Sequence, residues 1–299
     1  MTEEILGFLQ NNVVEYTRET SLSKLSFVKI GGVADTVVYP ESEQKLISLI
    51  EVLTKNNIAY IILGRMSNVL PAKEHYSDVI IRTDRMDEFR LEGNNLIASA
   101  GISLPRLSKI LAGASLSGFE ALSGIPGSLG GAIRGNAGAY GREISELLTL
   151  IRVYDPNKME TYDIRPSELD FGYRKSSVGY RGLIVLSAHI RGVHSDFDKI
   201  CSSMRSIASK RRSSQPVDKP SLGSVFKRPG EDIYPWKLIS DAGLRGYRLG
   251  DAQISEKHSG FIVNLGKATA RDYLSVVERS EMLVSEKYGI NLEREFELM

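Results

Sequence analysis

The amino-acid sequence predicts an α+β protein with two lobes. At 299 residues the chain is about twice the length of a common domain. Segments with strand and helix periodicity alternate through its first two thirds. A helical segment beginning at residue 195 then runs into a basic, polar linker that contains Pro216 and Pro220. We therefore expect a domain boundary near residue 195.

The first lobe begins with a strand, an amphipathic helix and a second strand, which together indicate a βαβ unit. The helix has four apolar residues on one face, namely Leu46, Leu49, Ile50 and Leu53. A further strand, a hairpin and a helix with Ser103 as N-cap follow. The corresponding segments are 34–40, 41–57, 58–64, 78–83, 89–101 and 103–115.

The rest of the chain alternates in the same way. We expect strands at 147–155, 159–164, 182–190, 258–266 and 290–298. Helices are expected at 235–243 and 269–289, the last with Thr269 as N-cap. Residues 195–221 are expected to form a helix that ends in the basic linker, and residues 165–176 a short helix that leads into a loop.

Composition excludes several functional classes. The net charge of +1 shows no excess of positive charge of the kind that favours binding to nucleic acid or to an anionic membrane. The single cysteine, Cys201, cannot form an intrachain disulfide, which fits a reducing compartment such as the cytoplasm. The first residues lack the basic start of a signal peptide. No run of about 18 apolar residues occurs and the histidines show no zinc-ligand spacing, so we expect neither a membrane span nor a metal site.

Two common nucleotide-binding motifs are absent. No two of the 27 glycines are two positions apart, which rules out G-x-G-x-x-G. The one Gly-Lys pair is followed by Ala268, so the chain has no P-loop.

Glycine is instead concentrated in residues 124–141, "GIPGSLGGAIRGNAGAYG", with seven glycines in eighteen positions. Such a segment is either a loop that needs unusual backbone angles or a set of backbone N–H groups lying against a phosphate or a flat ring. The loop "LGRMSN", at the end of a buried strand, is a second candidate of this kind. Two such loops in one lobe favour a dinucleotide ligand.

These segments carry a family resemblance. The motifs "LSFVKIGGVAD", "ILGRMSNVL", "GIPGSLGGAIRGNAGAYGREI", "FGYRKS", "PSLGSVFKRP", "ISDAGLRG", "KHSGFIVN" and "LEREFEL" occur in the order found in the UDP-N-acetylenolpyruvoylglucosamine reductase family. The sequence resembles this family from about residue 20 to its C-terminus. The resemblance implies an FAD-dependent oxidoreductase of peptidoglycan precursor synthesis, which serves cell wall biogenesis, cell shape and cell division.

The resemblance also implies an architecture. The first lobe would be a two-subdomain FAD-binding fold of the vanillyl-alcohol oxidase type, and the C-terminal α/β lobe would bind substrate. We expect these three domains at 1–82, 83–194 and 195–299. No inserted tyrosine loop follows "FGYRKS", so the chain resembles the shorter type of the family. The residues expected to bind FAD are Gly64, Arg65, Met66, Ser67, Asn68, Gly124, Ile125, Pro126, Gly127, Ser128, Gly131, Asn136, Gly138 and Tyr140.

Three residues match the family's catalytic positions. Arg174 would stabilise the charge that develops beside the substrate carboxylate, and Ser224 would donate a proton to the substrate carbon. Glu295 would be the partner of Arg174. Residue patterns alone do not select these side chains, since Glu293, Glu295 and Glu297 lie on one face of the expected C-terminal strand.

Substrate and reductant follow from the same resemblance. Four residues are expected to bind the UDP-sugar, namely Tyr140, Lys227, Arg228 and His258. NADPH would be the hydride donor, and we expect a monomer that binds no nucleic acid.

The sequence departs from the family pattern at Met66, where a glycine is usual, and at Arg228, where an asparagine is usual. We expect the backbone at Met66 to take a negative φ or the loop to shift. Two other readings remain open: another FAD-dependent oxidoreductase on this fold, such as a sugar or alcohol oxidase, and a nucleotide-sugar-binding protein that has lost its flavin site.

Overall fold

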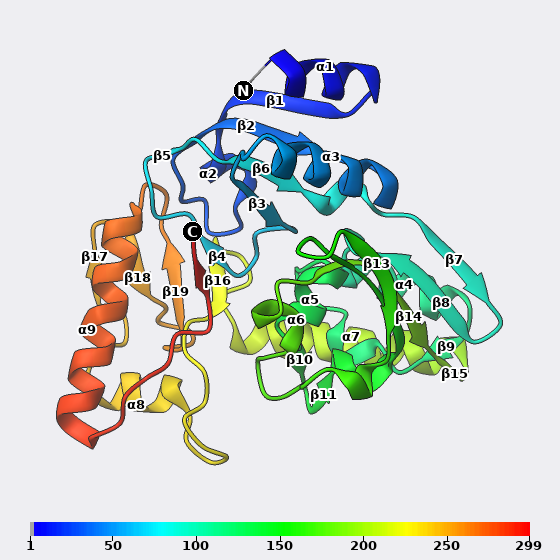
Figure 1. Cartoon of the computed structure of the whole chain (residues 1–299). Helices are drawn as coiled ribbons and strands as arrows, with labels where there is room; N and C mark the ends of the chain where they lie inside the picture. Colours follow the sequence, from blue (N-terminus) through cyan, green and yellow to red (C-terminus); the bar gives the residue numbers. More distant parts are fainter. Residues whose placement is uncertain (1–2) are drawn as a thin grey trace. The chain divides into compact units, whose positions relative to one another are not determined.

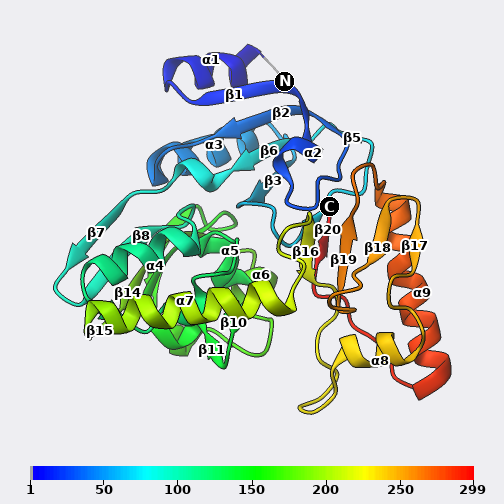
Figure 2. The same cartoon turned by 180° about the vertical axis from the view of Figure 1, so that it is seen from behind.

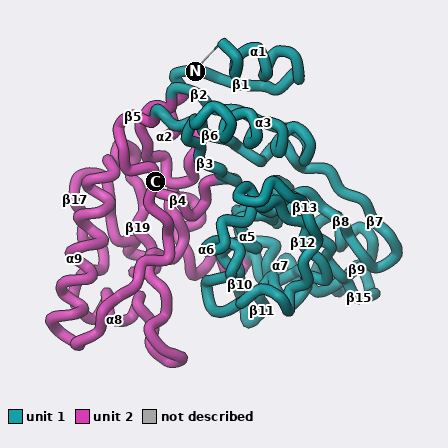
Figure 3. The backbone as a smooth tube through the Cα atoms, viewed as in Figure 1, with its two compact units in different colours: residues 1–19, 35–65, 77–208 teal, residues 20–34, 66–76, 209–299 magenta. Residues whose placement is uncertain are grey.

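The computed structural model describes residues 3–299, which form two compact units (Figure 3). The first unit comprises residues 1–19, 35–65 and 77–208, and the second comprises residues 20–34, 66–76 and 209–299. Each unit therefore draws on separate stretches of the chain. Helix α7 (Phe197–Ser214) contributes residues 197–208 to the first unit. The three consecutive domains expected from the sequence stay a prediction.

The first sheet has the order β1-β2-β6-β3 and lies mainly in the first unit. Short β5 pairs with residues 33–34 at the start of β2, and both of these segments belong to the second unit. Strands β2, β3, β5 and β6 pair in parallel. Helix α3 lies along this sheet and buries the four predicted residues of its apolar face (Figure 1). Ser42 caps α3, since its side chain accepts from the amide of Lys45. The elements are α1 (Glu3–Asn11), β1 (Glu15–Ser21), β2 (Val33–Tyr39), α3 (Glu43–Lys55), β3 (Tyr60–Leu63), β5 (His75–Tyr76) and β6 (Val79–Arg82).

The second sheet of the first unit is antiparallel, with the order β13-β12-β14-β8-β7. Its strands are β7 (Phe89–Glu92), β8 (Asn95–Ser99), β12 (Leu148–Asp155), β13 (Glu160–Ile164) and β14 (Ile184–Arg191). The long helix α7 is seen most clearly from behind (Figure 2). Ser103 caps α4 as expected, because its side chain accepts from the amide of Arg106.

Shorter elements complete the first unit. The helices are α4 (Leu104–Gly113), α5 (Leu129–Arg134) and α6 (Ser177–Tyr180), and the 3₁₀ turns are η1 (Thr83–Arg85), η2 (Glu120–Leu122), η3 (Ile144–Leu147) and η4 (Pro166–Glu168). Two short antiparallel pairs join β9 (Leu116–Ser117) to β15 (Val193–His194) and β10 (Gly138–Ala139) to β11 (Arg142–Glu143).

The second unit is built on an antiparallel sheet of order β16-β19-β18-β17, and on a parallel pair of β20 with β4. Helix α9 packs against β17 and β18 and buries Tyr273, Val276, Val277 and Val284. The elements are α2 (Leu22–Leu25), β4 (Val69–Leu70), β16 (Ser221–Ser224), α8 (Pro235–Asp241), β17 (Arg248–Leu249), β18 (Ala252–Ile254), β19 (Phe261–Asn264), α9 (Ala270–Tyr288) and β20 (Glu297–Leu298).

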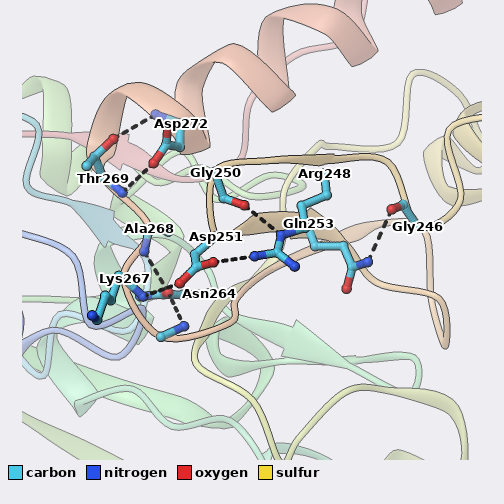
Figure 4. Close-up of polar contacts among 11 residues, drawn as sticks. Gly246, Arg248, Gly250, Asp251, Gln253, Asn264, Lys267, Ala268, Thr269 and Asp272 are labelled. Carbon is cyan, nitrogen blue, oxygen red and sulfur yellow. Dashed lines mark hydrogen bonds and ion pairs between the residues drawn. The ribbon is translucent and has the colours of Figure 1, made fainter.

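A polar network ties the β17–β18 turn to the loop before α9 (Figure 4). The carboxylate of Asp251 accepts from Arg248 at 2.5 Å and from the amide of Lys267 at 2.8 Å. The Lys267 hydrogen bond is the main reason why the pKa of Asp251 lies below its usual range. Thr269 and Asp272 form a capping box that starts α9 where the sequence predicted.

The prediction of a continuous strand over 290–298 is wrong. Only Glu297 and Leu298 form a strand, and Arg294 makes an isolated bridge with Phe226. A strand over 290–298 would place Leu298 on the face opposite the three glutamates, yet Leu298 is 52 % exposed. Strand β20 pairs with β4 in a two-stranded ladder and not with the larger sheet of the second unit.

Candidate flavin and substrate sites

In the first unit, both of the predicted cofactor loops are in contact. A Cβ atom added to Gly64 would lie 2.2 Å from the Oγ atom of Ser128, so only glycine fits this approach. Ser128 is itself the N-cap of α5 and accepts from the amide of Gly131. At this contact the loops meet through a glycine and a serine, small residues that leave room for a flat or anionic group.

Part of the glycine content has a packing role instead. The amide of Gly130 donates to the carbonyl of Ala100 at 2.8 Å, and a Cβ on Gly130 would lie 3.0 Å from the Cβ of Ala100. This glycine permits close contact between two backbone segments. Of the seven glycines in this segment, Gly141 has a positive φ, and the expected contact of the segment with a ligand stays a prediction.

Tyr140 is the exposed aromatic residue of the glycine-rich segment. Its side chain is 47 % exposed and its φ of +52° is unusual for a bulky residue. It borders an open cavity of about 410 Å³, whose lining residues are Gly118, Glu120, Ala121, Tyr140, Gly141, Arg142, Ser203 and Ile207. An exposed aromatic ring at such a cavity can lie against a ring or sugar of a ligand.

Arg174 occupies the third position of a tight turn in the first unit. Gly172 and Lys175 exchange two backbone hydrogen bonds of 3.0 and 3.1 Å, and Arg174 between them has a φ of +56°. Its guanidinium donates to the carbonyl of Gly138 at 3.1 Å and lies 4.9 Å from the centre of the Tyr173 ring. A left-handed arginine costs roughly 1–2 kcal/mol, and such strain is found most often at functional sites.

In the second unit, the predicted catalytic residues Ser224 and Glu295 lie on adjacent segments. The amide of Glu295 donates to the carbonyl of Val225 at 2.8 Å, and the amide of Lys227 donates to the carbonyl of Glu293 at 2.8 Å. The Ser224 hydroxyl makes a long contact of 3.4 Å to the carbonyl of Phe226. Because this contact is weak, the hydroxyl can rotate toward a substrate.

Asn68, a predicted cofactor residue, belongs to the same assembly in the second unit. Its side-chain amide donates to the carbonyl of Glu295 at 3.0 Å, and its own carbonyl accepts from the amide of Glu297 at 2.9 Å. Asn68 therefore fixes the segment that carries Glu295. The neighbouring Ser67 is partly buried.

Met66 keeps the left-handed backbone that a glycine would provide. Its φ is +52° and its side chain is 2 % exposed. The expected negative φ is therefore wrong at this residue, and a shift of the loop stays a prediction. Burial of the thioether side chain, worth roughly 1.5–3 kcal/mol, offsets the backbone strain.

Two of the substrate-binding residues predicted in the second unit are cations, Lys227 and Arg228. Lys227 forms an ion pair of 2.5 Å with Glu293, whose side chain is 72 % exposed, and Arg228 is exposed. The sequence did not predict that Glu293 pairs with Lys227, because nothing in its sequence context distinguishes Glu293 from an ordinary solvent-exposed acid. Surface pairs of this kind contribute about 0–1 kcal/mol.

The surroundings of His258 favour its neutral form. Its ring packs against Trp236 and Phe261, with centroids 5.8 and 5.0 Å apart, and its Nδ1 atom accepts from the amide of Gly260. Burial, followed by the charge of Arg245, lowers the pKa of His258. The remaining hydrogen is then on Nε2, where it can bond to a ligand oxygen.

Within residues 3–299, no cluster of three or more His, Cys, Asp or Glu side chains could hold a metal ion. Over the same residues, no helix combines the length and the apolar character that a membrane span requires.

Comparison with known proteins gives two family matches. Residues 34–157 match the FAD binding domain, and residues 215–299 match the C-terminal domain of UDP-N-acetylenolpyruvoylglucosamine reductase. The first match contains both glycine-bearing loops, and the second contains Ser224, His258 and Glu295.

Similarity extends along the whole chain. The UDP-N-acetylenolpyruvoylglucosamine reductase of Caldanaerobacter subterraneus subsp. tengcongensis is 40 % identical over 284 residues, which cover 95 % of this chain and 93 % of the relative. The enzyme of Lactiplantibacillus plantarum is 37 % identical and covers 100 % of this chain and 98 % of its own. The crystal structure of the reductase from Thermus caldophilus superposes with a TM-score of 0.80 at 33 % identity, over 95 % of this chain and 98 % of that one. The predicted α+β fold with an FAD-binding lobe and a C-terminal substrate lobe is confirmed.

Proposed function

Because the chain belongs to the UDP-N-acetylenolpyruvoylglucosamine reductase family, we propose a role for each of its predicted site residues in the reaction of that family. The family consists of FAD-dependent oxidoreductases of peptidoglycan precursor synthesis, which act on a UDP-sugar. We further propose that NADPH is the reductant, and that the protein works in the cytoplasm as a monomer.

When bound, FAD would supply the hydride chemistry that links NADPH to the enolpyruvyl double bond. The glycine-bearing loops of the first unit, which meet at Gly64 and Ser128, would hold this cofactor. Their backbone N–H groups suit its pyrophosphate, and the absence of side chains suits its flat ring.

Arg174 would stabilise the negative charge that grows beside the substrate carboxylate. A guanidinium is permanently charged and matches both oxygens of an enolate-like carboxylate. Its turn and its hydrogen bond to Gly138 hold it before substrate arrives, and such preorganised charge is often the largest catalytic contribution.

Ser224 would give the proton that completes the reduced product. A serine hydroxyl is a weak acid, but a carbanion is a much stronger base, so the transfer is favourable. The hydrogen bond from the Glu295 amide to the Val225 carbonyl holds Glu295 beside Ser224. The side chain of Glu295 would supply the catalytic carboxylate. This pairing of the two segments is the observation that carries the catalytic assignment.

The substrate's diphosphate would be bound by two kinds of group. Lys227 and Arg228 supply positive charge, and neutral His258 supplies a hydrogen bond from Nε2. Tyr140, beside its cavity, would contact the ligand near the flavin ring.

A visible absorption spectrum of the purified protein tests the function. Under anaerobic conditions, NADPH should bleach the flavin bands, and the UDP-linked enolpyruvyl sugar should restore them. Bands that return only with oxygen would identify an oxidase. A protein that takes up no FAD would identify the third reading, a binding protein without flavin chemistry.

A further inference from the structure

The side chain of Asn136 makes three hydrogen bonds within the first unit. The residue is 0 % exposed, and its Nδ2 atom donates to Oε2 of Glu143 at 2.7 Å and to the carbonyl of Gly172 at 3.0 Å. Its Oδ1 atom accepts from the amide of Ser145 at 3.3 Å. Both hydrogens of the amide are thus used. The contact with FAD expected for Asn136 stays a prediction.

Gly172, one of these acceptors, is the first residue of the turn that carries Arg174. The two backbone hydrogen bonds between Gly172 and Lys175 make the turn a rigid unit. A bond from Asn136 to the Gly172 carbonyl therefore fixes the start of the turn, two residues before the arginine.

The contacts form a closed ring. Arg174 donates to the carbonyl of Gly138, and Gly138 pairs with Glu143 across β10 and β11. Glu143 accepts the other hydrogen of Asn136. The ring contains two residues with positive φ, Asn136 at +43° and Arg174 at +56°. Such backbone angles persist only where the surrounding contacts enforce them.

We propose that Asn136 is a positioning residue for Arg174. By joining Gly172 to Glu143, its buried amide holds the guanidinium at a fixed place relative to the glycine-rich segment. Removing the amide leaves a buried carbonyl and a carboxylate without this donor, so the turn shifts or loosens. The inference rests on the proposed function, since it assumes that Arg174 acts on the substrate.

The test compares Asn136→Ala with Asn56→Ala in the full-length, FAD-loaded enzyme. Asn56 is the matched control, because its amide also donates to a backbone carbonyl of the first unit, that of Val52, away from the ring. Rapid mixing measures the two half-reactions separately. Asn136→Ala should be reduced by NADPH within about threefold of the wild-type rate, and its reoxidation by the enolpyruvyl sugar should be at least about tenfold slower. Asn56→Ala should show neither loss.

Hydrogen exchange gives a readout that does not depend on turnover. In Asn136→Ala the peptide containing residues 172–175 should exchange its amide hydrogens faster than in wild type. In Asn56→Ala its exchange rate should equal that of wild type. Equal slowing of both half-reactions, loss of FAD, or unchanged exchange in this peptide would overturn the proposal. If wild-type enzyme itself is not reoxidised by the sugar, the proposed function fails instead.

A second pair of variants applies if Asn136→Ala does not fold. Glu143→Gln keeps an oxygen that can accept from Asn136, whereas Glu143→Ala removes it. Reoxidation should be at least about threefold slower in Glu143→Ala than in Glu143→Gln. Equal rates in the two variants would overturn the proposal.

Discussion

The backbone amide of Glu295 donates a hydrogen bond of 2.8 Å to the carbonyl of Val225, the residue that follows Ser224. Two segments far apart in the sequence are thereby joined where each carries a proposed catalytic side chain. Asn68 adds a third segment through its bond to the Glu295 carbonyl. The second unit thus fixes the relative position of Ser224 and Glu295 by backbone contacts.

The two glutamates of the C-terminal segment provide a matched pair of variants. Glu295→Gln removes a proposed catalytic charge and should lower kcat by about 10²-fold or more. Glu293→Gln removes only the exposed partner of Lys227 and should change kcat/KM by at most about fivefold, because such pairs contribute about 0–1 kcal/mol. Steady-state kinetics of both variants gives the comparison, and equal losses would refute the assignment of Glu295.

Replacement of Arg174 by lysine tests the need for a forked cation. Arg174→Lys keeps the charge but loses the bidentate geometry and the second donor position. We expect reoxidation by the substrate to slow by about 10²-fold, while reduction by NADPH continues. Near-normal reoxidation in rapid-mixing experiments would mean that charge alone suffices.

Met66 can be tested by unfolding in urea. Met66→Ala keeps the left-handed strain and loses the buried side chain, so it should be destabilised by about 2–5 kcal/mol. Met66→Gly loses the same side chain but relieves the strain, and should be more stable than Met66→Ala by about 1 kcal/mol. The reverse order would show that the backbone at this position is not strained.

His258 predicts a pH dependence of stability. Burial lowers its folded pKa below the unfolded value near 6.5, so the unfolded state binds the proton more tightly. Its contribution is present above about pH 6.5 and is lost as the pH falls through the folded pKa. His258→Phe keeps a ring against Trp236, and its unfolding free energy should fall less than that of wild type between pH 7.5 and pH 5.5. Parallel pH profiles would contradict this.

Sequence patterns predicted the regular elements well where periodicity and caps agree. Leu46, Leu49, Ile50 and Leu53 bury one face of α3, and Ser103 and Thr269 begin α4 and α9. The C-terminal segment was predicted less well. Its apolar residues Leu292 and Phe296 are buried, as the alternation of apolar and charged residues indicates. How much of the segment becomes a strand depends on pairing with distant segments, which no local pattern encodes.

The site was predictable only in part. Family motifs led to Arg174, Ser224 and Glu295, whereas periodicity could not separate Glu295 from Glu293. The bond from Asn136 to the Gly172 carbonyl joins two separate motifs, and Met66 has a left-handed backbone although it is not a glycine. Such contacts become visible only once the chain is folded.

The most direct test of the central claim is the reoxidation half-reaction of Ser224→Ala. Pre-reduced with NADPH and mixed anaerobically with the UDP-linked enolpyruvyl sugar, this variant should regain its flavin bands at least about 10²-fold more slowly than wild type. Its reduction by NADPH should proceed at a near-normal rate. Reoxidation of Ser224→Ala at the wild-type rate would contradict the assignment of Ser224 as proton donor.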